Sequence, residues 1–288
     1  MSELTTPEKI AEVEAIRSHE RDPEEARIRL CALLVDPDEE VRAEASGAVW
    51  EHSDAPELVE KALELSGQDP SARVRAKAMT ALGRVLYEGS VAGADEAGYT
   101  PDPLLGEPTA DVFKKVRAHL LAAAQDDKRT VDERRFALEG LGFLGEDRTI
   151  AGLIDTFWKR SEPAARLSAI FAMGRSGDAR WATNIREALS SKEDELRLQA
   201  IWAAGEAEVQ PARDALVGIA RTGKRTEERI AAIEALARLG GEPVAQLLLA
   251  LAEKDDDSEV REAAATGLEE LALLEAIEDE EGSSDEAD

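Results

Sequence analysis

The sequence predicts an all-α fold, a right-handed α-solenoid of about seven antiparallel helix pairs followed by a C-terminal capping helix. Three observations predict it: an arginine recurs along the chain, an alanine follows each one by three residues, and strand-like alternation is absent. The arginines are Arg42, Arg75, Arg134, Arg166, Arg197, Arg229 and Arg261, separated by 33, 59, 32, 31, 32 and 32 residues. The alanines are Ala45, Ala78, Ala137, Ala169, Ala200, Ala232 and Ala264. A period near 32 is typical of stacked helix pairs that bury their apolar faces only against their neighbours.

Turn and cap residues divide this repeat into helices. Asp-Pro pairs at Asp22, Asp36 and Asp69 each offer an N-cap followed by a proline at the first helical position. Glycines that follow apolar-periodic segments offer left-handed C-caps, at Gly145, Gly177 and Gly240. In chain order, the predicted helices span 7–20, 23–35, 37–52, 55–66, 70–87, 109–125, 130–144, 148–160, 163–176, 179–190, 194–207, 211–222, 226–239, 243–253 and 258–275.

One long step of 59 residues locates an insertion. Residues 88–107 hold four glycines and two prolines, which predicts an irregular loop without helix. Tyr99, Leu104 and Leu105 give this loop apolar side chains with which to dock. The remaining chain is predicted as a single solenoid over 1–275 and a disordered acidic tail over 276–288, which has no basic residue.

The charge distribution bears on the partner. The net charge is −27, of which residues 231–288 carry −15 from 3 basic and 18 acidic side chains, whereas residues 128–230 are close to neutral. A binder of free DNA or RNA needs a basic footprint, so the composition argues against free nucleic acid and favours a basic protein partner.

No apolar run approaches a membrane span, and the N-terminus lacks the apolar core of a signal peptide, so we expect a cytoplasmic protein without membrane contact. The one cysteine, Cys31, lies in an apolar run and is expected in the core.

Three segments resemble the HEAT repeat, particularly its short prokaryotic form seen in phycobilin-lyase-type proteins. They are residues 69–83 (DPSARVRAKAMTALG), 165–174 (ARLSAIFAMG) and 228–237 (ERIAAIEALA). The resemblance covers about residues 20–275 and implies a helical solenoid. It is nearly silent on function, because the family includes scaffolds, adaptors, transport receptors, lyase subunits and some DNA glycosylases. It also implies that the repeated arginines tie neighbouring repeats together. Arg134 departs from the pattern, because Glu133 precedes it where an apolar residue is usual.

Residues for chemistry are sparse. His19, His52 and His119 are the only histidines, they lie in three different predicted helices, and none has a second ligand at helical spacing. No nucleotide-binding loop or nucleophile elbow occurs. The sequence therefore predicts no catalytic, cofactor or metal site.

Four aromatic residues form the candidate partner-binding site. Phe171 and Trp202 lie five residues after their repeat arginines, and Phe136 and Phe143 lie two and nine residues after theirs. At helical spacing these positions point away from the predicted core. Clustered exposed aromatics mark interfaces. Two alternatives stay open: the face is buried by the fold itself or by the loop 88–107, or it forms a homodimer, which is less favoured.

The sequence thus favours a non-enzymatic protein-protein interaction scaffold or adaptor. One alternative is a lyase-type or base-excision-type enzyme or enzyme subunit, which would need a cleft around Asp155, Trp158, Trp181 and Arg186. Another is an acidic chaperone or nucleic-acid mimic that shields a basic protein with its acidic ends.

Overall fold

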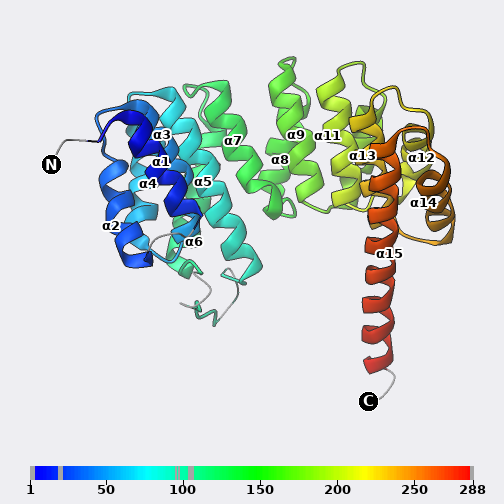
Figure 1. The fold of residues 1–288 in the computed structure, drawn as a ribbon. Helices are drawn as coiled ribbons and strands as arrows, with labels where there is room; N and C mark the ends of the chain where they lie inside the picture. The colour runs from blue at the N-terminus through cyan, green and yellow to red at the C-terminus, as the bar shows by residue number, and fades with distance from the viewer. Residues whose placement is uncertain (1–3, 19–21, 95, 97, 103–106, 286–288) are drawn as a thin grey trace. The chain divides into compact units, whose positions relative to one another are not determined.

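The computed structural model describes residues 4–18, 22–94, 96, 98–102 and 107–285, with side chains described up to Leu273. Over this range it holds fifteen α-helices, four short 3-10 turns and no strand (Figure 1). The helices are α1 (Thr6–Arg17), α2 (Pro23–Leu33), α3 (Glu39–Gly47), α4 (Pro56–Gln68), α5 (Ala72–Val91), α6 (Ala110–Gln125), α7 (Val131–Leu141), α8 (Arg148–Trp158), α9 (Pro163–Arg175), α10 (Ala182–Leu189), α11 (Asp194–Glu206), α12 (Arg213–Thr222), α13 (Thr226–Leu239), α14 (Glu242–Lys254) and α15 (Ser258–Asp285). The predicted all-α repeat fold is confirmed.

The aspartates of two Asp-Pro pairs do not cap helices as predicted. Helix α3 has Asp38 as its N-cap, and α5 follows Ser71, so both begin two residues later than expected. Asp36 and Asp69 instead accept the backbone N–H of residues 38 and 71, at 2.9 and 2.8 Å, and stabilise the turn before each helix. This leaves their remaining oxygen atoms available for cations.

Glycine ends only some of the helices where it was expected to. Gly177 and Gly240 have φ of +61° and +64°, a backbone region that glycine adopts readily, although Gly240 has ψ of −174° and is not a left-handed helical C-cap. Gly145 has φ of −62° and remains right-handed, so its predicted role is wrong.

Helix α5 extends further into the insertion than the glycine content predicted. It continues to Val91, so residues 88–91 are helical. Gly89 is buried inside the helix, where an added Cβ would lie 2.6 Å from Phe113 Cδ2 of α6. The glycine therefore permits close helix packing and does not break the helix. Beyond it, Tyr99 donates a hydrogen bond to the Pro108 carbonyl at 2.9 Å. Leu104 and Leu105 lie outside the described residues.

At the other end, the backbone of α15 is helical to Asp285, beyond the predicted end at residue 275. This differs from the disordered tail predicted for 276–288. The side chains after Leu273 lie outside the described residues.

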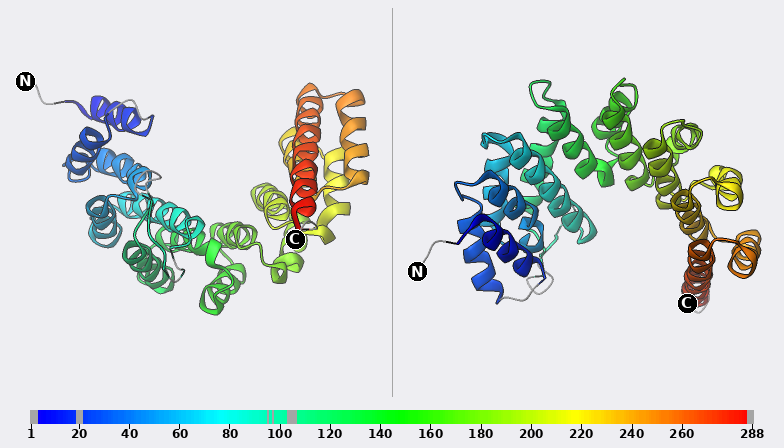
Figure 2. Two further views of the ribbon diagram at one scale, coloured as in Figure 1. Left: turned by 90° about the horizontal axis from the view of Figure 1, so that it is seen from below. Right: turned by 45° about the horizontal axis from the view of Figure 1, so that its top comes forward.

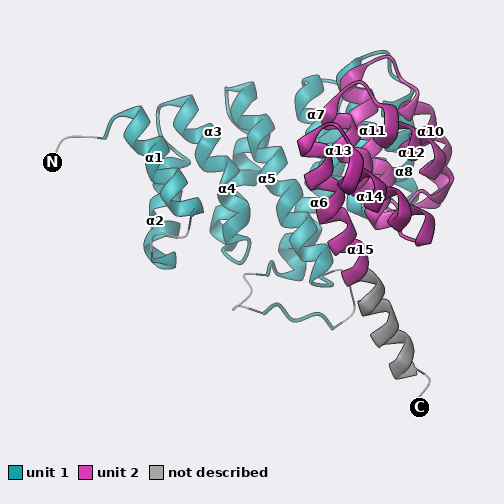
Figure 3. Ribbon diagram, turned by 45° about the vertical axis from the view of Figure 1, so that its right-hand side comes forward, with its two compact units in different colours: residues 1–172 teal, residues 173–288 magenta. Residues whose placement is uncertain are grey.

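The chain divides into two compact units, Met1–Ala172 and Met173–Asp288, at a boundary inside α9 (Figure 3). In each unit the odd-numbered helices pack on one another: α3 on α5 and α5 on α7 in the first, α11 on α13 and α13 on α15 in the second. We call them the odd layer. The even-numbered helices, the even layer, pack on their odd neighbours, as α4 does on α5 and α12 on α13 (Figure 2).

Small residues bring the odd helices together. All seven alanines that follow the repeat arginines by three residues are fully buried, at 0 % exposure. Glycines lie next to these alanines, eight residues after the repeat arginine of one odd helix. Each glycine contacts a small residue that lies six residues after the repeat arginine of the next odd helix. A Cβ on Gly83 would lie 2.7 Å from Gly140 Cα, and one on Gly205 would lie 2.8 Å from Ala235 Cα. The odd layer is therefore closely packed.

Candidate functional site

The repeat arginines reach from one helix pair to the next. Arg42 donates two hydrogen bonds to Asp69, at 2.8 and 3.1 Å, and a third to the Asp36 carbonyl at 2.8 Å. Arg197 donates to Glu228 at 3.1 Å and to the Ser191 carbonyl at 2.8 Å. Arg229 pairs with Asp255. These contacts give Arg42, Arg197 and Arg229 the structural role that the resemblance implied.

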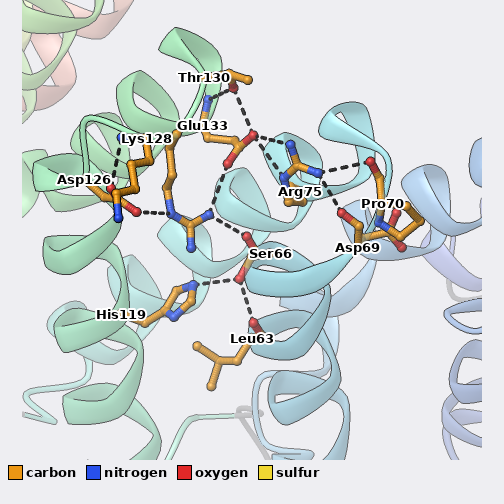
Figure 4. A network of polar contacts seen from close by, with 11 residues as sticks. Leu63, Ser66, Asp69, Pro70, Arg75, His119, Asp126, Lys128, Thr130 and Glu133 are labelled. Carbon is orange, nitrogen blue, oxygen red and sulfur yellow. Dashed lines mark hydrogen bonds and ion pairs between the residues drawn. The ribbon is translucent and has the colours of Figure 1, made fainter.

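Arg75 makes the same kind of link across the insertion (Figure 4). It donates to Glu133 at 3.0 and 2.9 Å, and Arg129 and Thr130 donate to the same carboxylate at 3.1 and 3.0 Å. Burial alone would raise the pKa of Glu133, but the hydrogen bonds from Arg75 and Thr130 outweigh it, so the pKa lies below its usual value.

The role of Glu133 explains why an acidic residue precedes Arg134 where the repeat pattern has an apolar one. The position before Arg134 is acidic because it holds the acceptor for Arg75, and Glu228, before Arg229, serves Arg197 in the same way. Arg134 itself pairs with Asp127 at 2.7 Å and donates to the Ala124 carbonyl at 3.3 Å.

The two histidines that the structure describes, His52 and His119, are part of the packed interior. His119 shares a hydrogen bond of 2.7 Å with Ser66 Oγ, whose hydroxyl also donates to the Leu63 carbonyl (Figure 4). Burial, and then nearby Arg129, lower the pKa of His119. His52 is buried, and His19 lies outside the described residues. No group of three metal-ligating side chains occurs in the described part of the chain.

The four predicted partner-binding aromatics differ in exposure. Phe136, Phe143 and Phe171 are half-buried, whereas Trp202 is 43 % exposed. Phe143 packs on Tyr87 with ring centroids 4.3 Å apart, and the Arg135 guanidinium covers Phe136 at 3.9 Å from the ring centre. The three phenylalanines belong to the first unit and Trp202 to the second, so the single contiguous patch stays a prediction.

Trp202 belongs to a set of positions that we call the free face. It comprises the residues one, five and nine after the repeat arginine in the odd helices of the second unit. Two of its members are half-buried, Leu198 and Ile230, and the others are exposed: Trp202, Glu206, Glu234, Arg238, Glu262, Thr266 and Glu270.

A groove lies between α13 and α15 on this face. Its volume is about 350 Å³, and it is lined by Ile230, Glu234, Arg238, Glu259, Glu262, Ala263, Thr266, Gly267 and Glu270. Sequence reasoning missed it by treating the acidic residues as solvated charge. The signal available was their offset: Glu262, Glu234 and Glu270 lie one, five and nine residues after their repeat arginines, at positions of the free face.

The residues proposed for an enzymatic cleft have structural contacts. Asp155 lies 3.7 Å from Lys159 Nζ, and Trp158 lies under the Arg166 guanidinium, 4.9 Å from the ring centre. Trp181 is buried at 4 % exposure, and Arg186 is exposed.

Among the described helices, none combines the length and the apolar character needed to cross a membrane.

Paired helices, a closely packed odd layer and arginine links between repeats define a helical-repeat solenoid. HEAT repeats are detected in the chain: a family model of HEAT repeats matches residues 150–235 and 182–269.

Solved structures support this fold. The complex of CpcE and CpcF of phycocyanin lyase from a Nostoc species matches with a TM-score of 0.55 and 16% identity, over 86% of this chain and 87% of that one. Importin beta matches with a TM-score of 0.55 and 15% identity, over 91% of this chain but only 41% of its own length. No curated protein sequence matches the chain. At such identities the similarity shows the fold alone.

Proposed function

We propose that the protein is a non-enzymatic scaffold or adaptor that binds a protein partner through the free face. One observation carries the proposal: Trp202, on α11, is 43 % exposed on an otherwise polar helix surface. Tryptophan is the residue most enriched among the anchors that dominate binding energy, and an exposed one is available to a partner without unfolding.

The buried polar groups support a structural, non-catalytic reading. Arg42 and Arg197 of the odd layer are held by acids of the next helix pair and by carbonyls of the turn before their own helix, and His119 is held by Ser66. Binding by such a scaffold depends on the shape and charge of its surface, and we propose a protein partner that is basic opposite the acidic helices α13 and α15.

A capture experiment with a matched control tests the proposal. The full chain, Trp202→Ala and Leu249→Ala are immobilised in equal amounts and exposed to extract of the native source, and bound proteins are quantified by mass spectrometry. Leu249 is the control because it is 51 % exposed but lies on α14 in the even layer. We expect Trp202→Ala to lose at least one partner that Leu249→Ala retains.

The opposite result would remove the basis for the proposal. If Trp202→Ala and the wild-type chain capture the same proteins in the same amounts, the free face does not carry binding. If wild-type chain in isolation has twice the expected mass by light scattering and Trp202→Ala does not, the occupant is a second copy of the chain.

A further inference from the structure

We propose that the groove between α13 and α15 binds an arginine- or lysine-bearing segment of a protein partner. This inference rests on the proposed scaffold function and gives it a site and a ligand chemistry.

The groove has the form of a peptide-binding channel. Ile230 and Ala263 supply apolar surface. Ala263 and Gly267 are small residues, which leaves space on the α15 side of the groove. Glutamates stand on both sides, Glu234 on α13 and Glu262 and Glu270 on α15. From Ile230 to Arg238 the channel follows eight residues of helix, or about 12 Å. This length fits about two turns of a bound helix or about four residues of an extended one.

Most of the negative charge of the groove is uncompensated. Four glutamates line the groove against one cation, Arg238, and that cation pairs with Glu206 on α11. Among the described residues none of the four, Glu234, Glu259, Glu262 and Glu270, forms an ion pair. The sequence after Leu273 adds no lysine, arginine or histidine. Burial, and then the negative charge of Glu270, raise the pKa of Glu234. The free protein therefore holds like charges close together, and a ligand cation would relieve their repulsion.

A basic protein segment fits this groove better than the other occupants do. Nucleic acid has the wrong sign, and a second copy of the chain would present the same acidic surface. Arginine and lysine carry an apolar stem below a charged head, so the stem can lie on Ile230 and Ala263 while the head reaches the glutamates. A cation between facing carboxylates also gains from the partial exclusion of water.

The test uses a defined probe and a charge-matched control. A fluorescein-labelled 12-residue helical peptide with three arginines at i, i+4 and i+8 is titrated with the full chain, and binding is read by fluorescence anisotropy. The same peptide with citrulline in place of arginine keeps the shape without the charge. The groove variant is Glu234→Gln/Glu270→Gln. The control variant, Glu253→Gln/Glu269→Gln, removes two charges from exposed positions outside the groove.

We expect the groove variant to raise the Kd for the arginine peptide about tenfold or more, a loss of roughly 1.4 kcal/mol. The control should change it less than about twofold, because Glu253 and Glu269 do not line the groove and exposed charges gain little from pairing through water. The citrulline peptide should not bind. The thermal midpoint of the groove variant should equal or exceed that of the wild type, which shows that the loss is not unfolding.

Two outcomes overturn the proposal. Equal weakening by the groove and control variants would mean that bulk acidity attracts the peptide, and an unchanged Kd in the groove variant would mean that it binds elsewhere. Trp202→Ala separates this proposal from the scaffold proposal, because the arginine peptide should still bind that variant. A negative capture experiment would therefore not affect the groove result. A negative peptide titration would likewise not affect the capture result.

Discussion

The junction between α5 and α7 and the junction between α11 and α13 are held by the same two kinds of contact. The chain that connects the paired helices is nevertheless much longer in the first junction than in the second. Arg75 reaches Glu133 across 58 residues, and Arg197 reaches Glu228 across 31. Gly83 meets Gly140 in the first junction as Gly205 meets Ala235 in the second. Residues at fixed offsets from the repeat arginine therefore determine the packing, and the loop length does not. Doubling a flexible loop costs only about 0.6 kcal/mol in closure entropy, which explains why the insertion is tolerated.

The two junctions differ in how strongly the acid is held. Glu133 is 2 % exposed and accepts hydrogen bonds from Arg75, Arg129 and Thr130. Glu228 is 4 % exposed and accepts from Arg197, with Arg225 at 3.9 Å. We infer that the junction beside the insertion depends more on its acid than the regular junction does.

The largest expected effect comes from removing that acid. Glu133→Ala should destabilise the protein by about 3–5 kcal/mol, because breaking a buried pair leaves its cations uncompensated. Glu228→Ala should cost less, since fewer donors lose their acceptor. Urea denaturation of both variants measures the difference, and equal costs would contradict the inferred asymmetry.

The same pair gives the first junction a defined acid sensitivity. The pKa of Glu133 is lowered in the folded chain, so its stabilisation is fully present above the unfolded value near 4.5 and is lost as the pH falls through the lower folded value. The decline in unfolding free energy below pH 4.5 should therefore be shallower in Glu133→Gln than in the wild type.

A smaller effect is expected from filling the glycine contacts. Gly83→Ala and Gly205→Ala should each cost about 1–3 kcal/mol, because the new Cβ would overlap the backbone of the neighbouring helix. Gly152 in α8 and Gly218 in α12 are matched helical controls with nothing within 4 Å of an added Cβ. Alanine there should stabilise by about 0.5–1 kcal/mol. Thermal denaturation of the four variants tests this, and stabilisation at all four positions would show that the odd helices are not in close contact.

The odd layer was largely predictable from the sequence, whereas the groove was not. Alanines at a fixed offset report directly on how closely two helices approach, so the register predicted their burial. Gly89 misled because a glycine required for packing against Phe113 looks the same in sequence as one that ends a helix. Glu234 and Glu270 misled for a related reason: a glutamate on a helix surface looks solvated until the neighbouring helix is placed beside it.

Histidine provides a further difference between the two junctions. All three histidines precede residue 173, and His119 lies beside Ser66 and Arg129 at the first junction (Figure 4). Because burial and Arg129 lower its pKa, the folded state binds a proton less readily than the unfolded state, whose value is near 6.5. Stability should therefore fall as the pH drops below about 6.5. Unfolding free energies at pH 7.5 and 5.5 should differ less in His119→Gln than in the wild type, and an equal difference would exclude His119 as the cause.

The smallest expected effect concerns the aromatic residues of the two units. Phe143 is half-buried against Tyr87, so Phe143→Ala should cost about 1–2 kcal/mol through the lost ring contact and apolar burial. Trp202 is 43 % exposed, so Trp202→Ala should change the unfolding free energy by no more than about 0.5 kcal/mol. Urea denaturation of the isolated chain decides between the two readings of the aromatic set. If Trp202→Ala costs about 3–5 kcal/mol, as core truncations do, the tryptophan is part of the core in solution and cannot anchor a partner. If the change in unfolding free energy is small, Trp202→Ala is the substitution of this set that would weaken partner binding while the fold stays intact.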